Sequence, residues 1–209
     1  MLSAVELLEQ APAGVEVPIV QIAEHAGLAK SVVYRQFAGR DELDRRIRSE
    51  IADRFVADIE DALDIADGSI NSILVRTVGA VVTWIEDHPR LHEFLRTGPS
   101  DDDSEIDAMS ALIGTIAAST RALVTGLAGV VGVSDDGSAD TMTFAIVSMT
   151  EATVTRWAND PQPVLTRDQL IEEVASYAWH VVDGVARRHG LTLDPDQQLV
   201  DIITRLATS

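Results

Sequence analysis

Hydrophobic residues recur along this chain at spacings of three and four, which is the spacing of one face of an α-helix. The longest regular series repeats every four residues and consists of Leu43, Ile47, Ile51, Phe55, Ile59 and Leu63. It predicts a helix over 41–66, about 40 Å long. Other apolar stripes predict helices over 2–10, 70–87, 90–96, 105–131, 138–159, 167–188 and 194–207. No segment convincingly shows the alternation of a strand, so the predicted fold class is all-α.

The stretch before the long helix predicts two short helices joined by a tight turn. Ile19, Ile22 and Ala23 share one helical face of the first helix. Gly27 then provides the residue type that best tolerates a positive φ at a helix end. Leu28, directly after the turn, is expected to be buried.

The second short helix is predicted over 30–36. Val33 and Phe37 turn inward, and the outward side chains are polar or basic, namely Lys30, Ser31, Tyr34 and Arg35. A helix, a glycine-containing turn and a second helix with exposed polar groups make the helix-turn-helix plan, whose second helix enters the DNA major groove.

At these residues the chain resembles the TetR family of transcriptional regulators. The resemblance covers roughly 1–47 and rests on Ile22, Ala23, Ala26, Gly27, Leu28, Val33, Tyr34, Phe37, Arg40, Asp41, Glu42 and Leu43. It implies a helix-turn-helix DNA-binding domain over 1–47 and an effector-binding and dimerisation domain over 48–209. The expected DNA contacts are Lys30, Ser31, Val32, Tyr34, Arg35, Gln36 and Arg40. Tyr34 and Arg40 are assigned to phosphates from the family pattern, while Arg35 is expected at a guanine or an adjacent phosphate.

The net charge of −18 does not exclude DNA, because the charge is unevenly distributed. Residues 1–50 carry six basic and eight acidic groups, whereas 51–209 carry ten basic and 26 acidic groups. From position 28 to position 48 the basic groups outnumber the acidic ones, six to three. Phosphate contacts are local, and salt screens charges beyond about 10 Å. Arg45, Arg46 and Arg48 are candidates for a flank of the DNA site. A solvated helix face that pairs with neighbouring acidic residues is at least as good an interpretation for Arg45 and Arg46, but not for Arg48.

The resemblance also implies an effector cavity in the second domain. Large apolar side chains at inward helical positions give an adaptable lining. The candidates are Trp84, Phe94, Met109, Ile113, Phe144, Met149, Trp157 and Trp179, together with Glu151. For each apolar residue taken singly, an ordinary core position is the preferred interpretation, but the set as a whole indicates an apolar effector. Glu151 could orient a ligand group or pair with Arg156.

The helices over 138–159 and 167–188 are apolar on more than one face. Because each such face must be buried, one can pack within the chain and another against a second copy. The chain is therefore expected to be a homodimer. The candidate interface residues are Ala175, Ala178 and Val182.

No catalytic, metal or cofactor site is expected. His88, His92 and Glu93 could form half of a metal site, but no third ligand motif follows, so a structural or surface role is preferred. The chain has no cysteine. It has no signal-peptide pattern, and its most apolar segment, 123–133, is shorter than the roughly 20 residues that span a bilayer. A cytoplasmic protein without a membrane partner is expected.

The sequence thus predicts a ligand-responsive transcriptional regulator, a repressor that binds a palindromic operator as a homodimer. An all-helical enzyme is not expected. The alternative is a small-molecule or protein-binding helical module with weak or lost DNA binding. It is motivated by the acidic charge, by the absence of a basic N-terminal arm, and by Val17 and Ala29 standing where the family often has capping residues.

Overall fold

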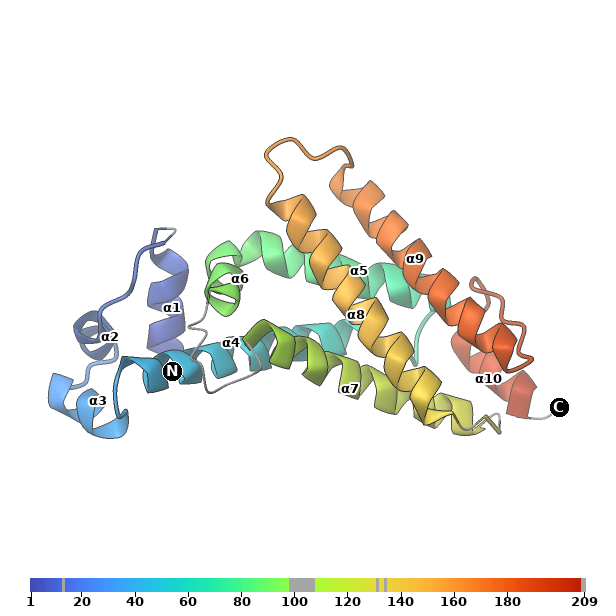
Figure 1. Cartoon of the computed structure of the whole chain (residues 1–209), viewed down its shortest axis with the longest axis horizontal. Coiled ribbons are helices and arrows are strands. Elements are labelled where there is room, and N and C mark those ends of the chain that lie inside the picture. The colour runs from blue at the N-terminus through green and yellow to red at the C-terminus, as the bar shows by residue number, and fades with distance from the viewer. Residues whose placement is uncertain (13, 98–107, 131, 134, 208–209) are drawn as a thin grey trace. The chain divides into compact units, whose positions relative to one another are not determined.

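The computed structural model describes residues 1–12, 14–97, 108–130, 132–133 and 135–207. Within them it contains ten α-helices and no strand beyond one isolated bridge between Ser69 and Gln198 (Figure 1). The helices are α1 (Leu2–Gln10), α2 (Ile19–His25), α3 (Lys30–Gln36), α4 (Arg40–Ala62), α5 (Ile70–Asp87), α6 (Pro89–Arg96), α7 (Ala108–Val130), α8 (Asp136–Ala158), α9 (Arg167–Arg188) and α10 (Leu199–Ala207). The all-α fold class is confirmed.

Helix α4 ends four residues earlier than its hydrophobic repeat predicted, because a distant arginine binds the carbonyls at its end. Arg76 on α5 donates from Nε to the Ala62 carbonyl at 2.7 Å and from Nη2 to the Asp64 carbonyl at 2.5 Å. A guanidinium that satisfies the free carbonyls of a last turn replaces further helical hydrogen bonds.

Helix α10 starts at Leu199 rather than at position 194, because the preceding backbone pairs elsewhere. The Asn71 amide donates to the Pro195 carbonyl at 2.9 Å, and the Leu199 amide donates to the Gly68 carbonyl at 3.1 Å. These bonds tie the segment before α10 to the α4–α5 connection.

One compact unit comprises Met1–Ala57 and Glu86–Ala111. It holds the three N-terminal helices, most of α4, and α6, with α1 packed against both α2 and α6. Its core is aliphatic and includes Val5, Leu8, Ile22, Val33, Leu43, Ile47, Ile51, Leu91 and Leu95. The first three residues that repeat along α4 belong to this core, as the sequence pattern predicted.

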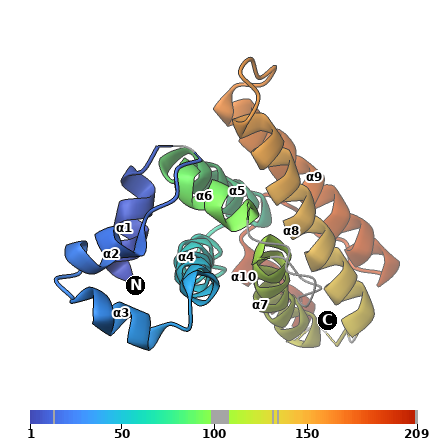
Figure 2. The same cartoon turned by 60° about the vertical axis from the view of Figure 1, so that its left-hand side comes forward.

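The other compact unit comprises Asp58–Ile85 and Leu112–Ser209. Helices α8 and α9 lie side by side in it (Figures 1 and 2). Its core includes Val78, Val82, Trp84, Leu112, Val154, Leu170, Val174, Ala175, Ala178 and Ile202. Thr166 begins α9 with a capping box, in which its side chain accepts from the Gln169 amide and the Gln169 side chain accepts from the Thr166 amide.

Helix α7 is the most apolar helix of the described chain. Its segment Met109–Val130 is long and apolar enough to cross a membrane by length and composition, with 11% of its most apolar window buried. The apolar run is therefore longer than the 123–133 segment suggested. Such a helix is by itself weak support for a membrane span, since helices of soluble proteins pass the same test.

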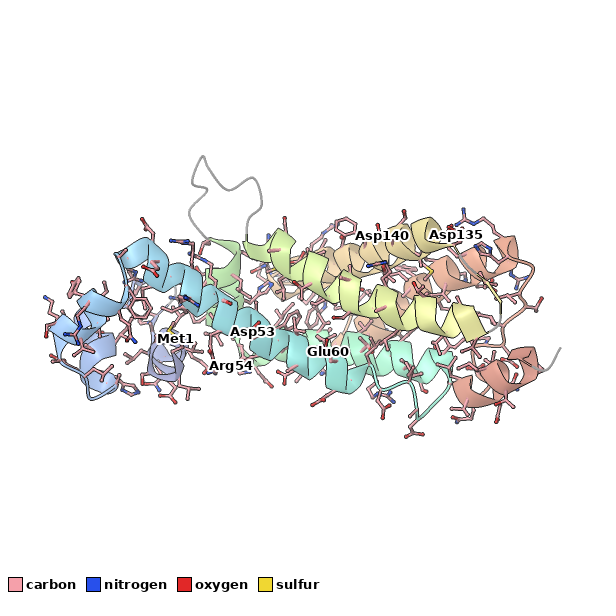
Figure 3. All side chains as sticks on the ribbon, turned by 90° about the horizontal axis from the view of Figure 1, so that it is seen from below. Met1, Asp53, Arg54, Glu60, Asp135 and Asp140 are labelled. Atoms are coloured by element: carbon pink, nitrogen blue, oxygen red, sulfur yellow. The ribbon has the colours of Figure 1, made fainter. Side chains whose placement is uncertain are left out.

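Acidic side chains project from the helices in both units. Asp53 and Glu60 on α4 and Asp140 on α8 are exposed (Figure 3). These carboxylates contribute to the chain's net charge of −18 and would repel duplex DNA that approaches those surfaces.

Candidate nucleic-acid interface

Helix α2 begins without a side-chain cap. Pro18 is the N-cap residue, with φ −65° and ψ 141°, and its carbonyl accepts from the Gln21 and Ile22 amides at 3.0 and 3.2 Å. Ala29 likewise caps α3 without a side-chain hydrogen bond. The expectation from Val17 and Ala29 that both helices lack a capping side chain is confirmed.

The turn between α2 and α3 is a Schellman motif centred on Gly27. The Leu28 amide donates to the Ala23 carbonyl at 2.9 Å, and the Gly27 amide donates to the Glu24 carbonyl at 3.1 Å. Gly27 has φ +65°, the left-handed conformation that this motif requires. Leu28 is 45% exposed, so the expectation that it is buried is wrong. It is the last residue of the motif, where the chain runs over the surface into α3.

Helix α3 presents its polar residues to solvent. Val33 is 4% exposed and anchors the helix, while Phe37 is half-buried. The exposed side chains are Lys30, Ser31, Tyr34, Arg35 and Gln36, with Val32 half-buried. The Lys30 ammonium lies 5.4 Å from the centre of the Tyr34 ring, one helical turn away. The outward and inward sides of α3 are therefore those that the sequence predicted.

Arg40, the first residue of α4, is engaged within the chain. Its Nε donates to Asp44 Oδ1 at 2.8 Å, and its Nη1 donates to the Val17 carbonyl at 2.6 Å. The same Nη1 lies 3.1 Å from Glu16 Oε1. The expected phosphate contact of Arg40 stays a prediction, but the guanidinium is paired with two carboxylates before any DNA arrives.

The arginines that follow on α4 divide into two kinds. Arg45 and Arg46 are exposed, whereas Arg48 is 7% exposed and therefore does not form a flank of the DNA site. The Arg48 guanidinium stacks 4.5 Å from the centre of the Phe94 ring, and Nε donates to the Phe94 carbonyl at 3.3 Å. Burial lowers the pKa of Arg48, and the neighbouring Asp44 opposes that shift.

Helix α6 is joined to the start of the chain by polar contacts. Arg90 donates from Nε to the Ala11 carbonyl at 3.0 Å and from Nη2 to the Val15 carbonyl at 3.1 Å. His88 pairs with Glu9 of α1. Sequence reasoning missed Arg90, because its acceptors are backbone carbonyls far away in the chain, which leave no mark in the sequence.

Solved structures share this arrangement of helices. A TetR-family transcriptional regulator from Streptomyces coelicolor aligns over 99% of this chain and 85% of its own, with a TM-score of 0.61 and 19% identity. A TetR-like transcriptional regulator from Rhodococcus sp. RHA1 aligns over 87% and 92%, with a TM-score of 0.53 and 21% identity. The TetR family regulator PfmR from Thermus thermophilus aligns over 86% and 94%, with a TM-score of 0.51 and 20% identity.

This chain has the TetR-regulator fold. The chain matches no protein-family model and no curated protein sequence. At identities near 20% the likeness establishes the fold alone. The chemistry of the helix-turn-helix region over 1–47, termed the head, follows from this chain's own residues.

The candidate effector residues differ in how far their side chains are buried. Trp84 is 5% exposed, and Phe94, Met109, Ile113, Met149 and Trp179 are half-buried. Phe144 is 53% exposed, so its assignment to an enclosed pocket of the single chain is wrong: it faces outward on α8. Trp157 donates from its indole to the Leu165 carbonyl at 2.8 Å, which joins α8 to the α8–α9 loop.

Two further expectations concern polar side chains, namely Glu151 as a ligand-binding group and His92 as part of a metal site. Glu151 is half-buried and accepts a hydrogen bond from Thr155 at 2.9 Å, so it is not a buried carboxylate awaiting a ligand. His92 is 7% exposed. Within the described ranges, no three metal-ligating side chains gather at one place.

Two of the three predicted dimer-interface residues are buried within the single chain. Ala175 and Ala178 are 0% exposed in the single chain, so their assignment to a surface between protomers is wrong. The pattern identified a real apolar face of α9, but that face packs inside its own unit. Val182 is half-buried and stays a candidate. The exposed aromatic side chains of the two helices are Phe144 at 53% and Tyr177 at 50%.

Proposed function

We propose that this protein belongs to the TetR family and is a DNA-binding transcriptional regulator. The observation that carries the proposal is the exposed polar face of α3 on a helix-turn-helix whose turn is fixed by a Schellman motif. A rigid turn matters because a recognition helix must enter the major groove at one defined angle. The proposed contact residues are Lys30, Ser31, Val32, Tyr34, Arg35 and Gln36.

Arg35 is the best candidate for reading sequence. It is exposed in the last turn of α3, and a guanidinium there can bond the O6 and N7 atoms of a guanine together. Such a bidentate contact discriminates against other bases by about 1–3 kcal/mol. Lys30 and Tyr34 lie one turn apart on the same helix and suit phosphates on the groove edge.

The acidic remainder of the chain makes this recognition selective. Basic groups outnumber acidic ones from position 28 to position 48, and the surplus of carboxylates lies in 51–209. Attraction to phosphates is therefore limited to the head, and duplex of the wrong sequence gains little affinity elsewhere.

The regulator acts as a homodimer through α8 and α9. Phe144 and Tyr177 support this, because aromatic side chains half exposed on adjacent helices are typical of the centres of interfaces. A palindromic operator follows from a two-fold dimer, and its recognition helices must lie about 34–36 Å apart. A small apolar effector that changes this separation would release the operator, which makes the protein a repressor. We propose separately that the protein is cytoplasmic and is not an enzyme.

The test is a fluorescence-anisotropy titration with the duplex upstream of the chain's own gene, compared with a scrambled duplex, at low and moderate salt. The native chain should prefer the upstream duplex. Arg35→Ala should bind the upstream duplex about tenfold or more weakly than the native chain does. Its affinity should also no longer depend on the base at one operator position. Arg205→Ala, which removes an exposed arginine from α10, is the matched control and should bind like the native chain. Equal affinity of the native chain for both duplexes at both salts would refute the proposal.

The second candidate is a helical small-molecule or protein-binding module that has weak or lost DNA binding. The absence of a side-chain cap at both α2 and α3 favours it, because each missing cap weakens a head helix by roughly 1 kcal/mol. This candidate predicts that neither the native chain nor Arg35→Ala distinguishes the two duplexes, while ligands still bind the second unit.

A further inference from the structure

We propose that Arg40 and Arg90 form a clamp on the α1–α2 connection, and that Arg40 positions α2 for DNA binding instead of contacting phosphate itself. The role in DNA binding rests on the proposed function. The clamp consists of two guanidinium groups, from α4 and α6, on the carbonyls of Ala11, Val15 and Val17. All of these residues belong to one compact unit.

The Arg40 guanidinium is committed to this connection by several contacts at once. It donates to the carbonyl of Val17 at 2.6 Å and to Asp44 at 2.8 Å, and lies 3.1 Å from Glu16. Its side chain is 24% exposed. Val17 is 6% exposed, so this residue packs against the unit's core, while its neighbours Glu16 and Pro18 are exposed. Moving Arg40 to a phosphate would remove the side-chain donor of the Val17 carbonyl.

The charges around Arg40 also disfavour a phosphate. Glu16 and Asp44 pair with the Arg40 guanidinium. Arg48 and Asp41 add one charge of each sign nearby, so the immediate surroundings carry a surplus of negative charge. A phosphate that approached would add a further anion and would repel these carboxylates. The side chains of Lys30 and Arg35, by contrast, are exposed on α3.

The clamp holds the backbone that enters α2, at a helix start that no side chain caps. A guanidinium donates to carbonyls and gives the free amides of the first turn no acceptor, so the clamp positions the start of α2 and does not replace a cap. Arg40 holds the carbonyl immediately before Pro18, while Arg90 holds the carbonyls of Ala11 and Val15 further upstream. Fixing where α2 starts also fixes α3, because the Schellman turn joins the two helices rigidly.

Two measurements separate positioning from phosphate contact. Hydrogen exchange of the α2 amides without DNA reports the clamp directly. The slope of a plot of log K against the logarithm of the salt concentration, where K is the association constant for DNA, counts the phosphates that the protein neutralises. Each contact contributes about 0.9 to the magnitude of the slope. Arg40→Ala should speed α2 exchange by about tenfold, the effect expected from losing charge-assisted hydrogen bonds, and should weaken binding to the upstream duplex without changing the slope.

Arg40→Gln keeps an amide donor for the Val17 carbonyl but removes the charge, so it should recover part of the protection and affinity that Arg40→Ala loses. Arg90→Gln should raise exchange at the same α2 amides. Arg46→Ala, which removes an exposed arginine from the same helix, should leave α2 exchange unchanged. A slope flattened by about 0.9 in both Arg40 variants, with native exchange of α2, would overturn the clamp and restore the phosphate contact.

Failure of the clamp and failure of DNA binding are distinguishable. A native chain that binds no DNA would refute the proposed regulator, while α2 exchange in the Arg40 and Arg90 variants would still test the clamp. If Arg40→Ala does not fold, the Arg40→Gln and Arg90→Gln variants decide the question, and native exchange in both would refute it.

Discussion

Replacing Gly27 by alanine tests whether one backbone conformation sets the geometry of the recognition helix. Gly27 has φ +65°, and a Cβ built there meets nothing within 4 Å. The variant therefore adds left-handed strain without adding a steric clash. For an L-residue with a Cβ that strain costs about 1–2 kcal/mol.

The matched control is Gly39→Ala. Gly39 lies in the same unit, a Cβ there also meets nothing within 4 Å, and its φ is not positive. Removing a glycine stabilises a fold by about 0.4–1 kcal/mol through the unfolded chain, but the Gly39 carbonyl accepts from the Leu43 amide at the start of α4, where alanine caps less well than glycine. The two effects at Gly39 partly offset each other, so the two alanine variants should differ by about 1–2 kcal/mol in the stability of the head. Gly27→Asn should lie between them, since asparagine visits the left-handed region more easily.

Hydrogen exchange of the α2 and α3 amides is the suitable assay, because the three tryptophans lie outside these helices and fluorescence would miss the head. Gly27→Ala should speed exchange by about 5- to 30-fold and weaken binding to the upstream duplex. Equal exchange in Gly27→Ala and Gly39→Ala would show that the Schellman turn is not under the constraint inferred from φ.

Other substitutions test the second unit. Ala178→Glu should destabilise the protein by at least about 3 kcal/mol in denaturant unfolding, because it overpacks a fully buried site with an unpaired charge. Tyr177→Glu should instead leave the fold intact and dissociate the dimer in sedimentation, and a dimer that persists would exclude Tyr177 from the interface. Thr166→Ala should cost about 0.5–2 kcal/mol through loss of the α9 cap, while Thr192→Ala, in an exposed loop, should cost nothing measurable. In a thermal-shift screen, apolar compounds should raise the melting temperature and should also release DNA. The order of the compounds by melting-temperature shift should change in Glu151→Ala. Stabilisation by sugars or nucleotides alone would refute the apolar pocket.

Much of the fold was predictable because its signals are local. The four-residue repeat along α4, the glycine at a helix end and the capping threonine before α9 each act within a few residues. The bounds of α3 and α9 were predicted to the residue for this reason. The outward face of α3 was predictable too, since Val33 must turn inward and the helical period then fixes its neighbours.

The partners of an apolar face or of an arginine were decided by the tertiary structure. Periodicity showed that Ala175 and Ala178 share an apolar face, but whether that face meets its own chain or a second copy depends on which helices pack there. The arginines of α4 look alike in the sequence, yet Arg48 stacks on Phe94, Arg40 holds the Val17 carbonyl and Arg46 is exposed. A guanidinium can satisfy any carbonyl, carboxylate or ring within its reach, so its role follows from which acceptors the fold brings to it.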